Sequence, residues 1–368
     1  MASLLRHSID IKALEDYICE HVPRIQIPIA VSQFECEQAN GTYLIKDRIG
    51  AKYVMREKPT GQLVSQSAHN FEREYRVLRI LHASSVPVPK IYCLCEETSV
   101  LGAPFYIREF LDGRIFEEPS FPGATPWERH RMWKEAVVTL AKLHSVDIDD
   151  AGLATYGRRT GFYQRQLRAW EDSRKAQRAV LDVEPVGPVP AVDVMADFFS
   201  LERYQPKDRA CLIHGDYKIA NLVFHKTEPR VIGILDWEMS TIGHPLADLA
   251  TLLQPFTIVT TLSAAAKELL MPFQLMSEVP GLPTVAECLF WYRTVAGWNP
   301  TSELTWASAY SLFRTSIVHQ RIPAAYAALQ ASRSTAIESA RDMSTCAWLT
   351  LTLIRRILEA DAEPRARI

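Results

Sequence analysis

The chain has 368 residues, a formal net charge of −2, 48% apolar residues and 23% charged residues. This composition is ordinary for a globular protein and argues against disorder. A charge so close to neutral gives no electrostatic footprint for nucleic acid or for an anionic membrane surface. We therefore expect no nucleic acid and no membrane among the partners.

The seven cysteines are scattered and include no CxxC pair. This pattern argues against a structural zinc or a disulfide framework and favours reduced thiols in a cytosol-like compartment. No segment approaches the roughly 18–20 apolar residues that span a bilayer. The acidic N-terminal segment does not resemble a signal peptide. Together these features predict a cytoplasmic protein.

The first 110 residues read as strands interrupted by one strong helix. Residues 9–21 have the spacing of an amphipathic helix, and residues 67–81 form the main helix, with an apolar stripe at helical intervals. Short apolar runs bounded by turn residues predict strands over 31–34, 41–46, 52–56, 91–94 and 105–110. The pattern indicates a small antiparallel sheet built from local hairpins.

Beyond Gly113 the pattern becomes helical. Helices are predicted over 127–145, 163–179 and 192–203, and almost throughout 250–356. We therefore predict an α+β fold with two lobes. The first lobe covers 1–111 with a hinge at about 109–113, and the second covers 112–368.

The central stretch of the chain, residues 212–249, contains a second predicted hairpin. Two apolar runs, 222–224 and 231–235, flank a turn-prone segment. An antiparallel hairpin would return Asp236 to the side of Asn221. Two side-chain oxygens aimed at one point suit Mg²⁺, which fills its octahedron with water and phosphate.

The motif His214-Gly-Asp-Tyr-Lys-Ile-Ala-Asn221, followed by Ile234-Leu-Asp-Trp-Glu238, resembles the aminoglycoside phosphotransferase and choline kinase superfamily, a relative of the protein kinases. Three flanking segments resemble the branch associated with acyl-CoA dehydrogenases: Tyr53-Val-Met-Arg-Glu-Lys-Pro59, Arg165-Gln-Leu-Arg-Ala-Trp170 and Gly243-His-Pro-Leu-Ala-Asp248. The resemblance implies a protein-kinase-like fold of two lobes. It also implies an ATP- and Mg²⁺-dependent small-molecule kinase.

The resemblance assigns a role to each polar residue of the motif. Asp216 would accept the proton of the attacking hydroxyl, and Asn221 and Asp236 would hold Mg²⁺ against the nucleotide phosphates. His214 is expected to be a packed residue of the loop rather than a base. Asp248 would accept backbone hydrogens of the same loop.

Arg56 matches the family's basic residue on the third strand, which contacts the α- and β-phosphates and pairs with a helix glutamate. Glu74 is the candidate for that glutamate, with Glu72 as the fallback. Arg56 departs from the kinase norm of lysine, and Lys58, two residues further along the strand, is the alternative phosphate contact. A solvated strand end is the structural alternative for all of them.

The predicted loop over the phosphates is poor in glycine. It contains only Gly41, so cover would come from the backbone amides near Asn40 and Thr42. The resemblance also implies that the main chain between Glu109 and Leu111 binds the adenine edge. A buried edge strand would explain the same residues.

The sequence says least about the molecule that accepts the phosphoryl group. Arginines between 158 and 178 could hold the phosphates of a hydroxyacyl-CoA thioester, although a solvated helix face is favoured. Aromatic residues near the C-terminus could form a cage for a quaternary amine, although their spacing favours ordinary core: Trp291, Tyr292, Trp298, Trp306, Tyr310 and Phe313. Candidate acceptors are therefore a hydroxyacyl thioester, an aminoglycoside-like alcohol and an amino alcohol.

A second class of function is a catalytically silent nucleotide-binding or scaffold protein with the same fold. The intact Asp216, Asn221 and Asp236 favour the enzyme, whereas Arg56 and the short phosphate loop favour the silent protein.

Overall fold

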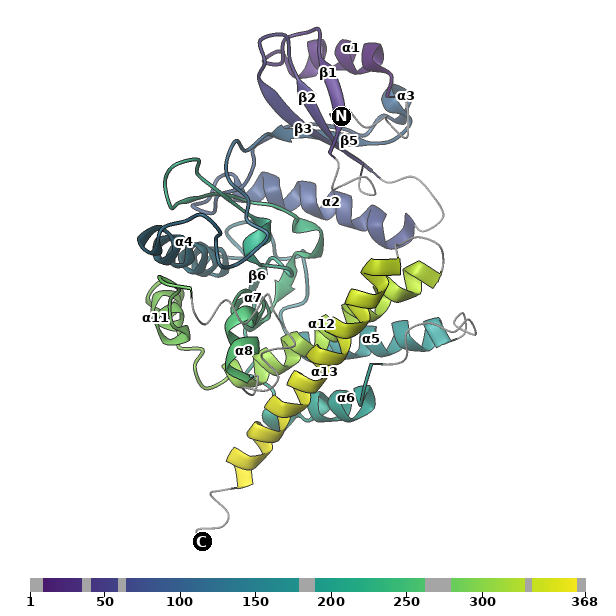
Figure 1. The fold of residues 1–368 in the computed structure, drawn as a ribbon. Helices are drawn as coiled ribbons and strands as arrows, with labels where there is room; N and C mark the ends of the chain where they lie inside the picture. Colours follow the sequence, from purple (N-terminus) through teal and green to yellow (C-terminus); the bar gives the residue numbers. More distant parts are fainter. Residues whose placement is uncertain are drawn as a thin grey trace. The chain divides into compact units, whose positions relative to one another are not determined.

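The structure is a computed structural model, and it describes residues 9–34, 41–58, 64–178, 189–261, 279–327 and 333–362. Internal contacts divide the chain into a first unit, Met1–Ile115 with Asn221–Ser240, and a second unit, Phe116–Ala220 with Thr241–Ile368 (Figure 1). The segment 221–240 therefore groups with the N-terminal residues, whereas the sequence had placed all of 112–368 in the second lobe.

The first unit contains a five-stranded antiparallel sheet, as the sequence predicts. Its strands are β1 (Ala30–Gln33), β2 (Thr42–Lys46), β3 (Lys52–Glu57), β4 (Ile91–Cys95) and β5 (Phe105–Glu109). Their spatial order is β1-β2-β3-β5-β4. After β3 the chain leaves the sheet to form α2 (Val64–Leu81), returns as the edge strand β4, and then places β5 between β3 and β4. Helix α2 begins three residues earlier than predicted.

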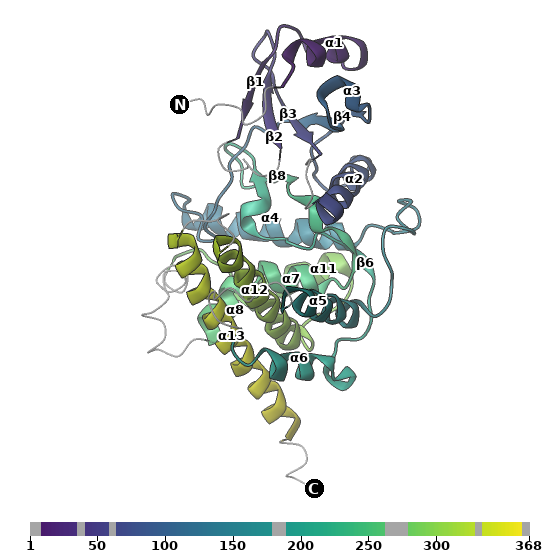
Figure 2. The same cartoon turned by 90° about the vertical axis from the view of Figure 1, so that its right-hand side faces the viewer.

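A different helix packs against each face of this sheet. Helix α1 (Ile11–His21), which Asp10 caps at its N-terminus, shares a core with Met55 and Ile107 on one face. Alternation along the strands turns Tyr106 to the other face, where its ring lies 5.1 Å from the ring of Phe71 on α2. The short helix α3 (Thr98–Leu101), which the sequence did not predict, lies beside α1 (Figures 1 and 2).

The hairpin predicted in the central stretch is present as β7 (Leu222–Phe224) and β8 (Val231–Ile234), which pair antiparallel. Arg114 N donates to Phe224 O at 2.7 Å, and Phe224 N donates back to Arg114 O at 2.8 Å. A Cβ on Gly113 would lie 2.3 Å from Phe224 O, so only glycine permits this close approach. These contacts explain why the hairpin groups with the first unit.

The second unit is mostly helical. Its helices are α4 (Pro126–His144), α5 (Phe162–Arg178), α6 (Val192–Ser200), α7 (Leu246–Leu252), α8 (Gln254–Thr261), α11 (Val285–Ala296), α12 (Leu304–Ala327) and α13 (Arg333–Ala362). Helix α4 begins with a capping box of Thr125 and Glu128, and its core-facing Trp133 and Leu140 are fully buried. Helices α12 and α13 run side by side (Figure 2).

A two-stranded sheet in the second unit escaped the sequence prediction. It pairs β6 (Cys211–Ile213) with β9 (Thr241–Gly243), and all but Thr241 of these residues are buried. Its two strands are far apart in the sequence, so no local hairpin turn marks them as partners. The sheet matters because the His214-Gly215-Asp216 motif follows directly after β6.

Within the ranges that the structure describes, no helix is both long enough and apolar enough to cross a membrane.

Candidate active site

Arg56 forms the centre of a buried ionic cluster in the first unit. Its Nε lies 3.1 Å from Glu74 Oε2, and its Nη2 lies 3.2 Å from Glu238 Oε2. The side chains of Arg56 and Glu74 are only 10% and 2% exposed. Of the two glutamates that the sequence offered as partners, Glu74 is the one that pairs with Arg56.

Charge and burial act together on this cluster. Burial opposes the charged form of Arg56, but Glu74 and the other nearby acidic groups outweigh it and raise the guanidinium pKa above its ordinary value. The pKa of Glu238 is raised, first by burial and then by the carboxylate of Asp236. Three carboxylates therefore surround one permanent cation.

Lys58 makes a different pair. It lies just past the end of β3, and its Nζ is 3.0 Å from Glu72 Oε1, whose side chain is 66% exposed. The two basic residues that the sequence could not separate thus differ in burial. Arg56 takes the interior position, and Lys58 lies at the surface.

Thr42 and Arg56 are cross-strand neighbours in β2 and β3. The Thr42 hydroxyl is buried and has no hydrogen-bond partner in the ranges that the structure covers. Gly41, just before it, has φ +60° and accepts a hydrogen bond from Glu57 N. Asn40 lies outside the described residues.

The predicted hinge begins at the end of β5. Glu109 N donates to Lys90 O at 2.8 Å, and Glu109 Oε2 accepts from Lys90 N at 3.2 Å. Leu111 O accepts from Gly113 N, whereas Leu111 N donates to no group in the described chain. An N–H donor is therefore available at Leu111.

Asn221 and Asp236 lie at the open end of the β7–β8 hairpin. Leu222 pairs with Ile234, and Leu235 N donates to Asn221 O at 2.9 Å. Asp236 is one residue further on and has φ 65° and ψ 58°, a left-handed conformation that is uncommon for a residue other than glycine. Its carboxylate makes no hydrogen bond or ion pair within the described part of the chain. Such backbone strain is often found at functional positions.

Asp216 belongs to the second unit and follows β6 in a tight turn. The turn depends on Gly215, whose φ of 88° favours glycine. His214 is fully buried, and its Nδ1 accepts a hydrogen bond from Asp216 N at 3.3 Å. The buried Tyr217 anchors the other side of the turn by donating to Ala136 O on α4. The carboxylate of Asp216 remains 30% exposed.

Asp248, near the start of α7, fixes the backbone of this turn. Its carboxylate accepts from His214 N at 2.6 Å and from Gly215 N at 2.8 Å. These are the backbone hydrogen bonds that the family resemblance implies for Asp248. Although burial opposes ionisation, hydrogen bonds from the His144 side chain and from the backbone of His214 lower the pKa of Asp248.

Two residues of this network were not assigned to it from the sequence: His144 was not singled out, and Tyr292 was named only as a possible cage residue. His144 Nε2 lies 3.3 Å from Asp248 Oδ2, and its Nδ1 lies 2.7 Å from the hydroxyl of Tyr292. Both residues sit on apolar helices, where a lone polar residue looks like ordinary core. Their position in the last turn of α4 and the middle of α11 gives no local signal of a partner.

Lys218 is a further neighbour of Asp216 that the sequence analysis did not single out. Its Nζ lies 2.9 Å from Asp216 Oδ2, and its side chain is half exposed. One of the two carboxylate oxygens of Asp216, the candidate base, is therefore paired with the ammonium group of Lys218.

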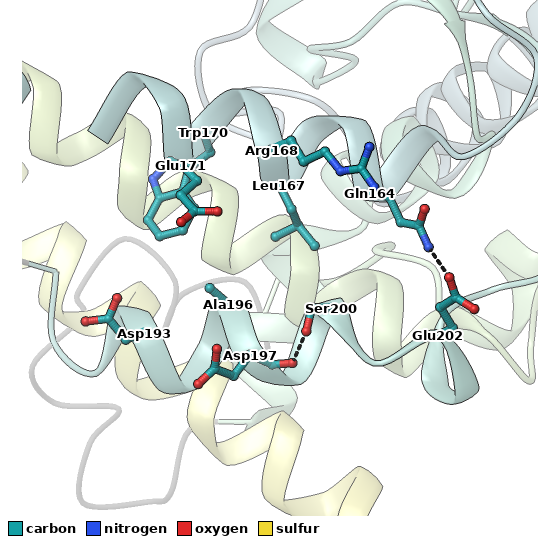
Figure 3. Close-up of a pocket in the computed structure, with 10 residues that line it drawn as sticks. All are labelled: Gln164, Leu167, Arg168, Trp170, Glu171, Asp193, Ala196, Asp197, Ser200 and Glu202. Atoms are coloured by element: carbon teal, nitrogen blue, oxygen red, sulfur yellow. Dashed lines mark hydrogen bonds between the residues drawn. The ribbon is translucent and has the colours of Figure 1, made fainter. Parts of the chain in front are cut away.

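The arginine-rich segment predicted as a possible anion site is mixed in charge. A pocket of about 490 Å³ lies between α5 and α6, and Figure 3 shows Arg168 there with four carboxylates: Glu171, Asp193, Asp197 and Glu202. Arg159 is exposed and pairs with Asp149. The described arginines therefore form no purely basic pocket, in agreement with the favoured solvated face.

The aromatic residues proposed as a cage are mostly core. The rings of Trp306 and Tyr310 stack at 5.4 Å, and both contact Phe199 and Tyr163. Trp306, Tyr310 and Phe313 are no more than 7% exposed. Their burial and mutual ring contacts are those of a packed core.

The first unit combines a small β-sheet, a buried basic residue with its helix glutamate, and a hairpin that ends in Asn and Asp. The helical unit contributes the HGD turn. Together these features define a kinase-like phosphotransferase. The family model described as "Phosphotransferase enzyme family" matches residues 30–283. The chain belongs to this family and is a phosphotransferase of the small-molecule kinase class.

Two relatives and one more distant structure are similar to this chain. Acyl-CoA dehydrogenase family member 11 of Rattus norvegicus is 33% identical over 98% of this chain and 46% of its own length. A crystal structure of a candidate aminoglycoside phosphotransferase from Ralstonia eutropha is 32% identical, covers 95% of this chain and 99% of its own, and has a TM-score of 0.79. The streptomycin–ATP complex of an aminoglycoside phosphotransferase is 15% identical over 85% of this chain and 91% of its own, with a TM-score of 0.54, and shows the shared fold.

The predicted protein-kinase-like α+β fold is thus confirmed. The chain spans less than half the length of the rat relative that it matches.

Proposed function

We propose that the chain transfers the γ-phosphoryl group of ATP to a hydroxyl of a small molecule. The observation that carries this proposal is the turn at His214-Gly215-Asp216. Asp248 fixes its backbone through two hydrogen bonds, while the Asp216 carboxylate stays accessible. A rigid, exposed carboxylate after a buried strand is suited to accept a proton from an attacking hydroxyl.

In the proposed reaction the acceptor oxygen forms a bond to the γ-phosphorus, and the bond between that phosphorus and the β,γ-bridging oxygen breaks. ADP leaves, and the hydroxyl proton passes to the carboxylate of Asp216. Because the transition state of phosphoryl transfer is loose, positioning and charge neutralisation matter more than covalent chemistry. Lys218 would orient Asp216 by holding one carboxylate oxygen, which leaves the other for the proton.

The nucleotide would be bound by the first unit. Arg56 is held in one orientation by Glu74 and Glu238, which favours a role in contacting the phosphates. The unpartnered hydroxyl of Thr42 on the neighbouring strand is a second donor. The free amide of Leu111 would donate to the adenine edge, with the carbonyl of Glu109 as the acceptor. Lys58 is the less suited basic residue because it is less buried than Arg56 and already paired with the exposed Glu72.

Asn221 and Asp236 would hold Mg²⁺. The donor set fits this ion, since both residues offer hard oxygen atoms and Asp236 supplies a carboxylate. When bound, Mg²⁺ would neutralise charge on the nucleotide phosphates. The strained backbone of Asp236 keeps its side chain at the hairpin end beside Asn221.

For the acceptor we keep the three candidates: a hydroxyacyl thioester, an aminoglycoside-like alcohol and an amino alcohol. The buried packing of Trp306 and Tyr310 weighs against a quaternary amine bound by those rings. The name of the rat relative favours testing hydroxyacyl thioesters first.

The test is ADP release from Mg-ATP across a panel of hydroxyl compounds from the three classes. Asp216→Asn should reduce release by at least about 100-fold with the active acceptor. Asp149→Asn, an exposed aspartate that is also ion-paired, is the matched control and should leave release unchanged. Equal release by wild type and Asp216→Asn would rule out the proposed base.

The rival function is nucleotide binding without turnover. It predicts that Mg-ATP stabilises the protein against heat while no compound of the panel stimulates ADP release. Stimulated release that depends on Asp216 would exclude it.

A further inference from the structure

A second cavity lies in the helical unit, and none of its described lining residues has been assigned a part in phosphoryl transfer. Its volume is about 500 Å³, within the range of small-molecule sites. Three helices contribute most of its walls: α8, the first turn of α12 and the last turns of α13. Neither Asp216 nor Asp248 nor His144 lines it.

The described residues that line the cavity carry a net positive charge. Among the lining residues that the structure describes, Arg356 is the single charged one, and no described aspartate or glutamate accompanies it. In the described part of the chain Arg356 has no ion-pair partner, whereas the preceding Arg355 pairs with Glu359 at 2.8 Å. The cavity therefore presents an uncompensated positive charge.

The N-terminus of α12 adds to that charge. Leu304 and Thr305 line the cavity, and the first backbone bond of the helix runs from Ala307 N to Glu303 O. The amides of Leu304, Thr305 and Trp306 therefore have no acceptor within the helix. The side chain of Glu303 is engaged elsewhere, because its Oε1 accepts from Lys207 N at 3.0 Å. The positive end of the helix dipole is thus available to an anion.

Thr261 supplies the observation that points to a ligand. It lines the cavity and is only 5% exposed, yet its hydroxyl has no hydrogen-bond partner among the residues that the structure describes. A buried hydroxyl without a partner destabilises the folded protein unless something else satisfies it. The other hydroxyls on α8 are satisfied within the protein: Thr257 donates to Leu253 O, and Thr260 donates to Phe256 O.

The remaining walls are apolar. Leu353 and Ile357 on α13 and Val285 at the start of α11 line the cavity with hydrocarbon surface. One guanidinium and about half a charge from the helix dipole neutralise a single negative charge rather than two. The planar guanidinium also matches a carboxylate.

We propose that this cavity binds an amphipathic carboxylate, with its charged head at Arg356, the α12 amides and Thr261, and its hydrocarbon part against Leu353 and Ile357. The site is independent of the proposed phosphoryl transfer.

The experiment is isothermal titration of the full chain, without nucleotide, using octanoate, octyl phosphate, octylamine and octanol as probes. Octanoate should bind, and octylamine and octanol should bind at least about tenfold more weakly because they bring no negative charge to Arg356. Tighter binding of octyl phosphate than of octanoate would overturn the assignment of a carboxylate. So would octanoate binding that is undetectable at millimolar concentration.

Two variants locate the site. Arg356→Gln should weaken octanoate binding about tenfold or more, because a charge-assisted hydrogen bond is lost. Arg355→Gln, one residue away and paired with Glu359, is the matched control and should change binding less than about twofold. Equal effects of the two substitutions would overturn the proposal.

Thr261→Val separates a ligand contact from a structural role. The substitution removes an unpartnered hydroxyl with little change in volume, so the melting temperature of the free protein should stay the same or rise. Octanoate binding should nevertheless weaken. An unchanged affinity would show that the hydroxyl makes no contact with the ligand. Asp216→Asn should bind octanoate as wild type does, which keeps this result distinct from the test of the base.

Discussion

His144 and Asp248 share a buried hydrogen bond, with His144 Nε2 lying 3.3 Å from Asp248 Oδ2 and both side chains no more than 2% exposed. Asp248 also accepts from the backbone of His214 and Gly215. The histidine at the end of α4 thus reaches the catalytic turn through a single aspartate. Asp248 serves as the positioning residue of that turn.

This network predicts a specific acid sensitivity. The pKa of Asp248 is lowered in the folded protein, so its ionised form contributes stability above the unfolded value of about 3.9, and that contribution is lost as pH falls through the lower folded pKa. Asp248→Asn should reduce the free energy of unfolding at pH 7 by about 3 kcal/mol, as expected when a buried pair loses one partner.

The measurement is urea unfolding at pH 7 and at successive values below pH 4. The difference in unfolding free energy between wild type and Asp248→Asn should become smaller as the pH is lowered. A gap that stays constant over this range would contradict a depressed pKa for Asp248.

The two basic residues at the end of β3 should differ in their contribution to stability. Arg56→Met leaves the buried carboxylate of Glu74 without its cation and should cost about 3–5 kcal/mol of unfolding free energy. Lys58→Met breaks an exposed pair with Glu72 and should cost less than about 1 kcal/mol. Adding Glu74→Leu to Arg56→Met should recover part of the loss. Similar costs for the two single variants in urea unfolding would refute the distinction.

Asp236→Asn tests the hairpin end as a metal site. Asparagine tolerates the left-handed conformation, so the variant should fold with little change in melting temperature. Nucleotide affinity should lose its dependence on Mg²⁺, with a decrease of about tenfold or more in the presence of the ion. The measurement compares nucleotide titrations with Mg²⁺ and with EDTA. The exposed Asp112→Asn is the control, and Mg²⁺-dependent binding that survives in Asp236→Asn would rule out this ligand.

His244 should make the protein less stable in mild acid. Its Nδ1 accepts from Leu246 N at 3.2 Å and its Nε2 donates to Lys207 O at 3.0 Å, so both nitrogens are satisfied in the neutral ring. Burial lowers the pKa of His244 to about 4. Since the unfolded histidine titrates near 6.5, the unfolded state binds more protons between pH 6.5 and 4, and stability falls as pH falls across this window.

Between pH 6.5 and 4 the free energy of unfolding should fall by at most about 3 kcal/mol because of His244, and His244→Gln should reduce this fall. Unfolding free energies at pH 7, 6, 5 and 4.5 would measure the slope for each protein. His21→Gln, at the exposed end of α1, is the control. A slope that is the same in wild type and His244→Gln would disprove the assignment.

The elements with a strong local pattern were predicted from the sequence. The five strands of the first unit, helix α4 and the β7–β8 hairpin follow from apolar periodicity and turn residues, which depend only on neighbouring positions. Asn221 and Asp236 flank the hairpin end for the same reason, because an antiparallel return fixes its own register. The residues of the HGD turn were also found, since their order along the chain identifies the family.

Only the tertiary structure decided which charges pair and which cavities remain. Glu74 rather than Glu72 faces Arg56, and Glu238, 182 positions away, completes the cluster. His144, Tyr292 and the cavity at Thr261 and Arg356 likewise depend on helices that are distant in sequence. Local periodicity determines which face of a helix is apolar, but the packing of whole helices determines which polar groups meet on it.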